Sequence, residues 1–316
     1  MSTKVASKKQ VIAVVGPTAS GKSELAVKIA KKVGGEIISA DSRQIYKGMN
    51  IGSGKVDGHW VRPTTGSNAS ARKVFLYKNI PHYLIDEVSP RVQYSVAQFQ
   101  KKAKSVIDDI ISRGKVPIIC GGTAQWVDVL IMEQVLPVVP PNFKIRRQLD
   151  KLSTEQMFVM LKKLDPKRAS GIDAKNPRRL IRALEIVMST GKPVPKLITP
   201  NINDSLFKVT WVGLYSDPQI LEQRIKKRLS ERLKLGMVKE VQKLHKQGVS
   251  WKRMESFGLE YKFCALFLQK KLTKAEFELQ LFTAIRQYTK RQMTWWKRNK
   301  NIRWYADAKN VSINSN

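Results

Sequence analysis

One stretch near the N-terminus restricts the fold of this chain more than any other. Residues 11–30 read VIAVVGPTASGKSELAVKIA. The apolar run VIAVV ends in glycine, which is typical of a buried parallel strand. The spacing of Leu25, Ile29 and Val33 then predicts a helix over residues 23–32. A strand, a glycine loop and a helix in this order form a cradle for phosphate groups.

The loop itself matches the complete G-x-x-x-x-G-K-[S/T] pattern of a P-loop. Backbone N–H groups of such a loop face the anion, and the lysine neutralises phosphate oxygens. The Ser23 hydroxyl is placed to hold Mg²⁺. The predicted diphosphate- or nucleotide-binding residues are Gly16, Pro17, Thr18, Ala19, Ser20, Gly21, Lys22 and Ser23.

Two further apolar runs end in polar or small residues. EIISA (36–40) is followed by Asp41, and VPIIC (116–120) is followed by the GGT of residues 121–123, after a predicted helix over 96–112. Strands that alternate with helices predict a parallel sheet. Since ligands bind at the carboxyl ends of such strands, Gly16, Asp41 and Gly121 are expected at one site.

The expected fold class is therefore α/β: a P-loop NTPase-like parallel sheet flanked by helices, with an all-helical insertion. Residues 1–137 and 204–316 form the core, including a strand at 207–216 and a long helix from Asp217 to about Gly236. Residues 138–203 form the insertion, which follows a hinge-like LPVVPPNF (136–143). Its last helix should begin at the N-cap Asn176 and end at Gly191. Residues 59–80, which include RPTTGSNASAR, are predicted to form a loop.

Asp41 has two interpretations that the sequence does not separate. Its carboxylate could hold Mg²⁺ or act as a general base, or it could cap the turn that follows. The 116–120 strand ends in glycines rather than in an acidic residue. This disfavours a motor-type ATPase, which needs an acid there to hold Mg²⁺ and water.

The charge of the chain points to a polyanionic partner. It has 58 basic and 25 acidic residues, a net charge of +33, so nucleic acid is the leading candidate. No uncharged apolar run approaches the length of a membrane span, and the N-terminus lacks the apolar centre of a signal peptide. Two distant cysteines and three scattered histidines form no zinc pattern. A cytoplasmic protein is expected, without a membrane partner.

Three basic clusters could meet that partner, although each has a simpler explanation. Arginines open the last helix of the insertion at residues 178, 179 and 182, and Arg224, Arg228 and Arg232 recur at four-residue spacing. Either set could bind phosphates or simply face water. Three C-terminal tryptophans lie among basic residues and could stack on bases or belong to the core: Trp295, Trp296 and Trp304.

Several ordered blocks resemble the tRNA dimethylallyltransferases, also called tRNA isopentenyltransferases, over nearly the whole chain. They are GPTASGKS, IISADSRQIYKGMNIGSGK, PHYLIDEVSP, YSVAQF, VPIICGGT, DPKRASGIDAKNPRRLIRALEI, LEQRIKKRLSERLKLGMVKEV and YTKRQMTWW. The resemblance implies transfer of a dimethylallyl group from dimethylallyl diphosphate to N6 of adenosine 37. That adenosine lies immediately 3′ of the anticodon, in tRNAs reading codons that begin with U.

By matched position, Asp41 would be the general base, Thr123 would lie near the target adenosine, and Lys22 and Arg228 would bind the diphosphate with Mg²⁺. The anticodon stem-loop would contact Asp41, Ser42, Arg43, Gln44, Thr123, Arg146, Arg178, Arg179, Leu180, Ile181 and Arg182. The family flips its target base out of the stack. Family precedent also implies a monomer.

The chain departs from the family pattern at Ala124-Gln125-Trp126 and at Ser53-Gly54, near the expected prenyl pocket or tRNA contacts. Three alternatives share the same cradle: a small-molecule or nucleotide kinase, an enzyme that prenylates free AMP or ADP, and a non-catalytic RNA-binding protein. The net charge and the arginine-rich insertion argue against a kinase. The insertion and the basic C-terminus favour tRNA over free AMP, and intact Lys22, Ser23 and Asp41 argue for catalysis.

Overall fold

The computed structural model describes residues 8–62, 73–196 and 205–311. Its one sheet has the order β3-β4-β5-β2-β6-β1-β7-β8. Neighbours from β5 to β8 pair in parallel, whereas β3, β4 and β5 pair antiparallel. The strands are β1 (Lys9–Val15), β2 (Gly35–Ser39), β3 (His59–Val61), β4 (Val74–Tyr77), β5 (Ile80–Tyr83), β6 (Val116–Cys120), β7 (Phe207–Leu214) and β8 (Arg303–Tyr305).

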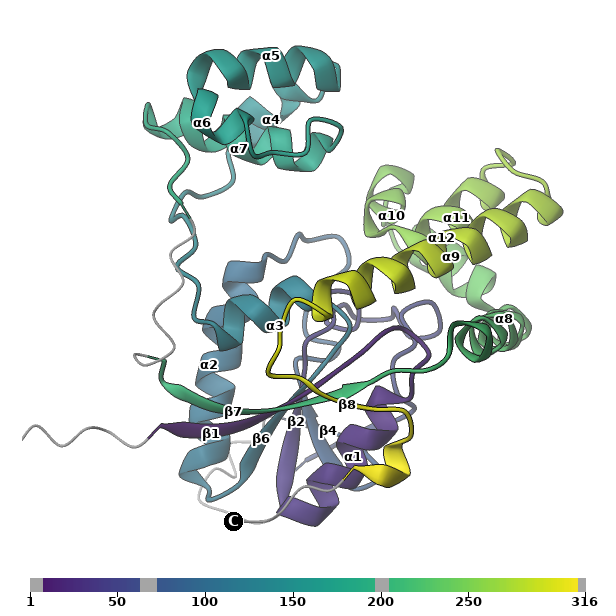
Figure 1. The fold of residues 1–316 in the computed structure, drawn as a ribbon. Helices are drawn as coiled ribbons and strands as arrows, with labels where there is room; N and C mark the ends of the chain where they lie inside the picture. The colour runs from purple at the N-terminus through teal and green to yellow at the C-terminus, as the bar shows by residue number, and fades with distance from the viewer. Residues whose placement is uncertain (1–7, 63–72, 197–204, 312–316) are drawn as a thin grey trace, which may run out of the picture. The chain divides into compact units, whose positions relative to one another are not determined.

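Helices cover both faces of the sheet because its central strands are apolar on both sides (Figure 1). On one face, Ile12 and Val14 of β1 pack with α1 (Lys22–Val33). On the other face, Val11, Ala13 and Val15 pack with α2 (Val96–Ser112) and α3 (Ala124–Ile131). This double burial explains the uninterrupted apolar runs in the sequence and confirms the expected α/β class.

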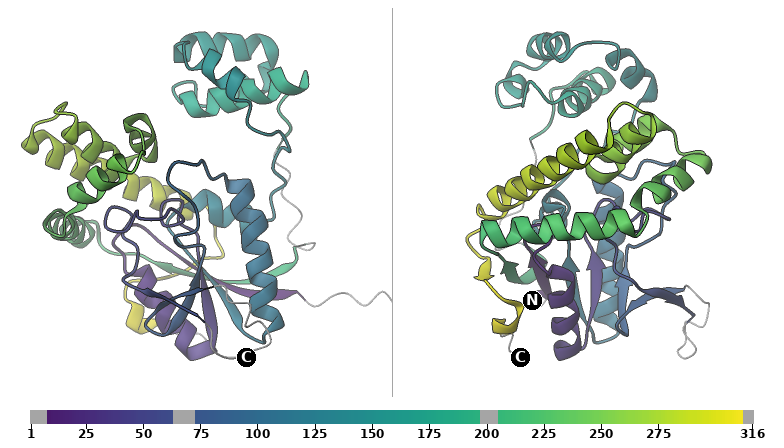
Figure 2. Two further views of the ribbon diagram at one scale, coloured as in Figure 1. Left: turned by 180° about the vertical axis from the view of Figure 1, so that it is seen from behind. Right: turned by 90° about the vertical axis from the view of Figure 1, so that its right-hand side faces the viewer.

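A helical layer from the C-terminal part of the chain joins the same core as α2 and α3. It consists of α8 (Pro218–Lys234), α9 (Met237–Lys246), α10 (Trp251–Phe257), α11 (Leu259–Leu268) and α12 (Lys274–Trp296). The helices α8 and α12 contact one another (Figure 2). Arg286 Nε of α12 lies 3.0 Å from Glu222 Oε2 of α8. A 3₁₀ turn (Ala308–Asn310) follows β8.

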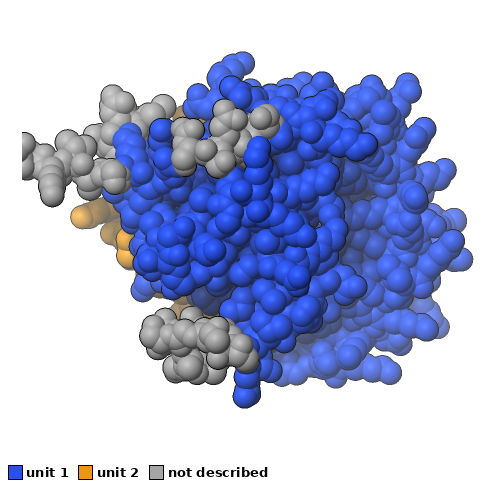
Figure 3. All heavy atoms as spheres, turned by 90° about the horizontal axis from the view of Figure 1, so that it is seen from below, with its two compact units in different colours: residues 1–133, 201–316 blue, residues 134–200 orange. Residues whose placement is uncertain are grey.

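The chain divides into two compact units, coloured separately in Figure 3. Unit 1 comprises residues 1–133 and 201–316, and unit 2 comprises residues 134–200. Unit 2 contains α4 (Phe143–Leu149), α5 (Thr154–Leu164), α6 (Pro166–Ala169) and α7 (Pro177–Thr190). These helices enclose a separate apolar core.

Most sequence-predicted boundaries agree with the structure. The helix at 96–112 has those bounds and a complete capping box at Ser95. Asn176 caps α7 through its side chain, and the left-handed Gly191 ends it. The prediction of a loop over residues 59–80 is wrong near both of its ends, because His59–Val61 and Val74–Tyr77 pair as the antiparallel strands β3 and β4. Residues 63–72 of that predicted loop lie outside the described residues.

No helix in the described residues is both long and apolar enough to cross a membrane.

Candidate active site

The P-loop lies at the carboxyl end of β1, where its shape depends on close contact with the neighbouring strand β7. Gly16 has φ +144°, and a Cβ atom there would lie 2.4 Å from the carbonyl oxygen of Leu214. Any side chain at this position would therefore push the loop away from the sheet. Gly21, at φ +91°, precedes the first residue of α1. The loop thus delivers Lys22 and Ser23 at a helix N-terminus, where backbone N–H groups favour an anion.

Two cations converge here without a carboxylate partner. Lys22 Nζ donates to the Pro17 carbonyl at 2.6 Å. Neither Lys22 nor Arg228 forms an ion pair with any residue that the structure describes. Burial lowers the pKa of Lys22 to about 8, and the nearby Arg228 guanidinium adds to the effect. Burial and the adjacent Arg232 likewise lower the pKa of Arg228 to about 10. Partly desolvated cations that lack an ion-pair partner are costly, so the site is suited to an anion.

The three arginines of α8 that share four-residue spacing have different environments. Arg224 is exposed and donates to the Ser216 hydroxyl. Arg232 is buried and pairs with the buried Glu260 of α11 at 2.9 Å. Only Arg228 is left facing the P-loop region without a protein anion. Neither alternative from the sequence, phosphate binding or exposure to water, therefore applies to all three arginines, because Arg232 is buried and paired with Glu260.

The departure at Gly54 bears directly on these arginines. Gly54 has φ +64°, and a Cβ atom there would lie about 2 Å from the Nη2 atoms of Arg228 and Arg232 (2.1 and 1.8 Å). The absent side chain leaves space for both guanidinium groups. The preceding residues are fixed by Glu240 of α9, whose carboxylate accepts the backbone N–H groups of residues 50, 51 and 52 and the Tyr261 hydroxyl.

The structure shows Asp41 in one of the two roles that the sequence left open, that of a cap, and leaves one of its carboxylate oxygens available for the other. Its Oδ1 accepts the backbone N–H of Arg43 at 2.8 Å and that of Gln44 at 3.4 Å, so it caps the turn after β2. Its Oδ2 has no hydrogen bond among the described residues. One oxygen therefore fixes the orientation of the carboxylate, and the other is left to accept a proton.

The GGT turn after β6 lies directly against the Asp41 turn. The Thr123 hydroxyl accepts the Ser42 N–H at 3.0 Å and donates to the Ser42 hydroxyl at 3.3 Å. A Cβ atom on Gly121 would lie 2.2 Å from the Ala40 carbonyl oxygen. Glycine is thus required for this approach, which places Thr123 beside Asp41.

The remaining members of the predicted DSRQ set are held within unit 1. Arg43 Nε donates to the Phe257 carbonyl at 2.6 Å, and its guanidinium lies 5.6 Å from the Phe257 ring centroid. Gln44 Oε1 accepts a hydrogen bond from the Ser39 hydroxyl, and Gln44 Nε2 donates one to the Gly54 carbonyl. These contacts join the Asp41 turn to α10 and to the loop that contacts Arg228.

Two residues of α12 that sequence reasoning missed complete the site. Gln292 Oε1 accepts the Thr18 N–H at 2.8 Å, and its Nε2 donates to the Gly122 carbonyl at 2.7 Å. The Tyr288 hydroxyl donates to the same carbonyl at 3.3 Å, and burial raises the pKa of Tyr288 to about 12. Both lie within the YTKRQMTWW block (288–296), which did not indicate which side chain reaches the loop.

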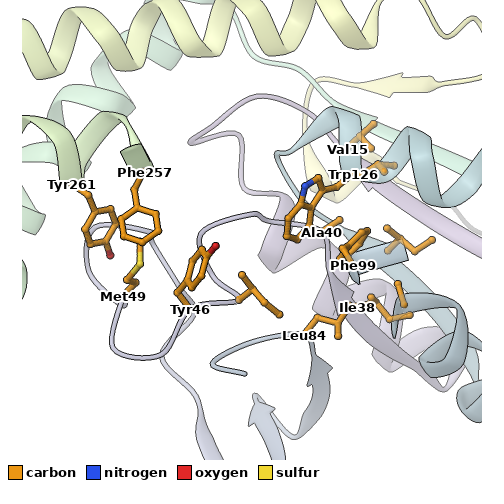
Figure 4. Packing of buried hydrophobic residues seen from close by; sticks show 14 of the residues in the cluster. Val15, Ile38, Ala40, Tyr46, Met49, Leu84, Phe99, Trp126, Phe257 and Tyr261 are labelled. Atoms are coloured by element: carbon orange, nitrogen blue, oxygen red, sulfur yellow. The ribbon is translucent and has the colours of Figure 1, made fainter. Parts of the chain in front are cut away.

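The aromatic residues near the site belong mainly to the core. Trp126, one of the departures from the family pattern, is buried and stacks on Phe99 with 4.4 Å between ring centroids (Figure 4). Trp296 is fully buried, Trp295 donates to Asp128 at 2.6 Å, and Trp304 packs against the core. Of the two explanations that the sequence left open for the three C-terminal tryptophans, the structure therefore favours packing in the core over stacking on bases.

In unit 2, two of the four predicted RNA-contacting arginines, Arg146 and Arg182, bind a buried glutamate. Glu185 of α7 is 0% exposed. It accepts Arg146 Nε at 2.7 Å, Arg182 Nη1 at 2.6 Å and the Asn142 N–H at 2.7 Å. Burial acts to raise the pKa of Glu185, but the hydrogen bonds from the two arginines outweigh it and the pKa is lowered.

Other members of the predicted 178–182 contact run have mixed environments. Arg178 and Arg179 are exposed, whereas Ile181 is half-buried against the unit 2 core. The expectation for Leu180 needs correction, because its side chain is fully buried in that core and inaccessible to RNA.

The P-loop also offers a possible ligand for Mg²⁺, the Ser23 hydroxyl. The described residues contain no group of three or more His, Cys, Asp or Glu side chains placed to hold a metal. A P-loop does not need one, because Mg²⁺ there takes one or two protein oxygens and several phosphate oxygens. The Ser23 hydroxyl has no hydrogen bond to the described part of the chain, so it fits this role.

Comparison with known proteins decides the family. A profile of the family described as IPP transferase matches residues 44–299. The chain belongs to the IPP transferase family. This family member is 37% identical over 313 residues to a tRNA dimethylallyltransferase of Pelotomaculum thermopropionicum, covering 96% of this chain and 95% of the relative. It is 39% identical over 290 residues to tRNA dimethylallyltransferase 2 of Treponema denticola, covering 91% of each.

Solved structures agree with this membership. A tRNA isopentenylpyrophosphate transferase from Bacillus halodurans has a TM-score of 0.66 and 31% identity, over 95% of this chain and 90% of that one. A eukaryotic dimethylallyltransferase acting on tRNA has a TM-score of 0.71 and 26% identity, over 96% and 75%. The resemblance noted from the sequence motifs is thereby confirmed.

Proposed function

We propose that this protein transfers the dimethylallyl group of dimethylallyl diphosphate to N6 of the adenosine immediately 3′ of the anticodon, position 37, in tRNAs reading codons that begin with U. Diphosphate is the second product. The observation that carries this proposal is the convergence of Lys22 and Arg228 near Asp41: two partly buried cations that form no ion pair with the described residues. The names of the relatives supply the substrate class.

In the proposed reaction, the P-loop N–H groups, Lys22 and Arg228 bind the diphosphate and stabilise the charge that develops as it leaves. The bound Mg²⁺, held by Ser23 and diphosphate oxygens, would supply further charge neutralisation. The adenosine N6 attacks the allylic carbon, the carbon–oxygen bond to the diphosphate breaks, and Asp41 Oδ2 accepts the N6 proton. Thr123 holds the Asp41 turn through Ser42.

The test is incubation with tRNA, dimethylallyl diphosphate and Mg²⁺, followed by mass spectrometry of the nucleosides. A five-carbon addition to adenosine at position 37 is expected. Product on free AMP but not on tRNA would instead assign the protein to adenylate prenylation. ATP-dependent phosphorylation of a small acceptor, without any prenyl product, would assign it to the kinases.

Asp41→Asn tests the role of the base. The amide retains an acceptor for the turn but cannot take the proton, so kcat should fall by about 10²–10⁴. Dimethylallyl diphosphate binding, measured by calorimetry, should be nearly unchanged. Modification of tRNA at the rate of the unaltered protein would contradict this role.

A further inference from the structure

Gln292 of α12 stands out because both ends of a buried amide are committed to main-chain atoms of the site. Its side chain is 3% exposed. Its Oε1 accepts the Thr18 N–H of the P-loop, and its Nε2 donates to the Gly122 carbonyl. A Cβ atom on Gly122 would lie only 2.7 Å from that Nε2, so the amide packs closely against the GGT turn. The side chain is therefore fixed in position and orientation.

The bond to Thr18 removes one donor from the phosphate cradle. A P-loop binds polyphosphates through its backbone N–H groups, and its lysine reaches the outer phosphates. Lys22 and Ser23 are the first residues of α1, whereas Thr18 lies four residues before Lys22, in the part of the loop nearer to β1, which we call the outer limb. A third phosphate that extended toward this limb would meet the Gln292 carbonyl oxygen instead of an N–H group. Two acceptors without a hydrogen between them repel one another, and the anion is left without a donor.

We infer that Gln292 closes the outer limb of the P-loop to a third phosphate and so makes the loop selective for a diphosphate. The inference rests on the proposed function, in which the loop binds the diphosphate of the prenyl donor. It explains how a loop with a complete nucleotide-binding pattern can avoid occupation by nucleoside triphosphates. The discrimination arises from a side chain 274 residues away in the sequence.

Inorganic pyrophosphate and tripolyphosphate are matched probes, because they differ by one phosphate and carry no base or prenyl group. Their dissociation constants are measured by calorimetry at fixed free Mg²⁺, and their inhibition constants in the tRNA prenylation assay. The unaltered protein should prefer pyrophosphate by about tenfold or more, the effect expected when one polar group is left unpaired. Equal binding of the two probes would overturn the inference.

Two variants then test Gln292 itself. Gln292→Ala removes the amide and opens space, whereas Gln292→Met keeps the bulk and frees the Thr18 N–H. In at least one of the two variants, the ratio of the tripolyphosphate to the pyrophosphate dissociation constant should fall toward one, because tripolyphosphate binding improves. A preference unchanged in both would show that Gln292 does not discriminate, even if both probes bind more weakly. If Gln292→Ala does not fold, Gln292→Met carries the test.

Gln269→Ala is the matched control, since Gln269 is half-buried at the end of α11 and bonds to Glu255. Its preference should equal that of the unaltered protein. The two proposals fail differently. A protein that discriminates between the probes but does not prenylate tRNA refutes the proposed function alone, and a prenylating protein that binds both equally refutes the role of Gln292 alone.

Discussion

The two units use the same residue type in opposite ways. In unit 1, Arg228 is desolvated beside Lys22 and Arg232, and no carboxylate in the described residues pairs with it. In unit 2, Arg146 and Arg182 share the buried carboxylate of Glu185. A buried cation without a protein anion lowers stability until a ligand supplies the charge, whereas a paired cation helps to hold the fold. The partner, rather than the basic residue, therefore separates binding from structure.

The strongest test of this contrast is Arg228→Met, which keeps the aliphatic length and removes the charge. Loss of one preorganised donor to the departing diphosphate should lower kcat/KM by about 10²–10³. The free energy of unfolding without ligand should stay the same or rise, because a desolvated charge beside Arg232 is removed. Steady-state kinetics and denaturant titration measure both quantities. A marked loss of stability would mean that Arg228 supports the fold instead.

Glu185→Ala should give the reverse pattern. Removal of the buried carboxylate leaves Arg146 and Arg182 without their partner, at a cost of about 3 kcal/mol in the free energy of unfolding. The low end of the usual range applies because both arginines are partly exposed and can reach water. Denaturant titration followed by a probe in unit 2 measures the change. An unaltered free energy of unfolding would show that the paired arginines of unit 2 do not stabilise the fold.

Much of the contrast was hidden from the sequence for a physical reason. Local patterns identify the P-loop, the strand ends and the caps of α2 and α7, because spacing and capping chemistry act over a few residues. Charge pairing, by contrast, joins residues that are far apart in the sequence. Arg232 and Glu260 are 28 residues apart, Arg146 and Glu185 are 39 apart, and Thr18 and Gln292 are 274 apart. Basic residues that looked equivalent in sequence were separated only by these tertiary contacts.

A smaller effect is expected from pH, through Lys22. Its pKa is lowered to about 8 in the protein without ligand, so the ammonium is protonated below that pH and progressively lost above it. The KM for dimethylallyl diphosphate should therefore rise above about pH 8, by up to about tenfold per pH unit. Lys22→Arg keeps its charge throughout this range. In this variant the rise in KM above about pH 8 should disappear, even if activity is lower. If KM still rose above about pH 8 in that variant, the rise would be due to the titration of another group.

The smallest expected effect concerns Arg179, which is exposed at the start of α7 and has no ion pair within the described residues. If it contacts a tRNA phosphate, Arg179→Ala should weaken tRNA binding a few-fold and reduce the slope of log K against log[salt] by about one. The free energy of unfolding should be unchanged, in contrast to Glu185→Ala.

Arg224→Ala is the matched control for Arg179→Ala, because Arg224 is also exposed, lies in unit 1 and bonds only to the Ser216 hydroxyl within the described residues. Filter binding across a salt series measures the slope for each variant. An unchanged slope for Arg179→Ala would show that an exposed, unpaired arginine is not sufficient for RNA contact. The lack of an ion-pair partner would then identify ligand-binding cations only where desolvation makes an unpaired charge costly in free energy, as it does at Lys22 and Arg228.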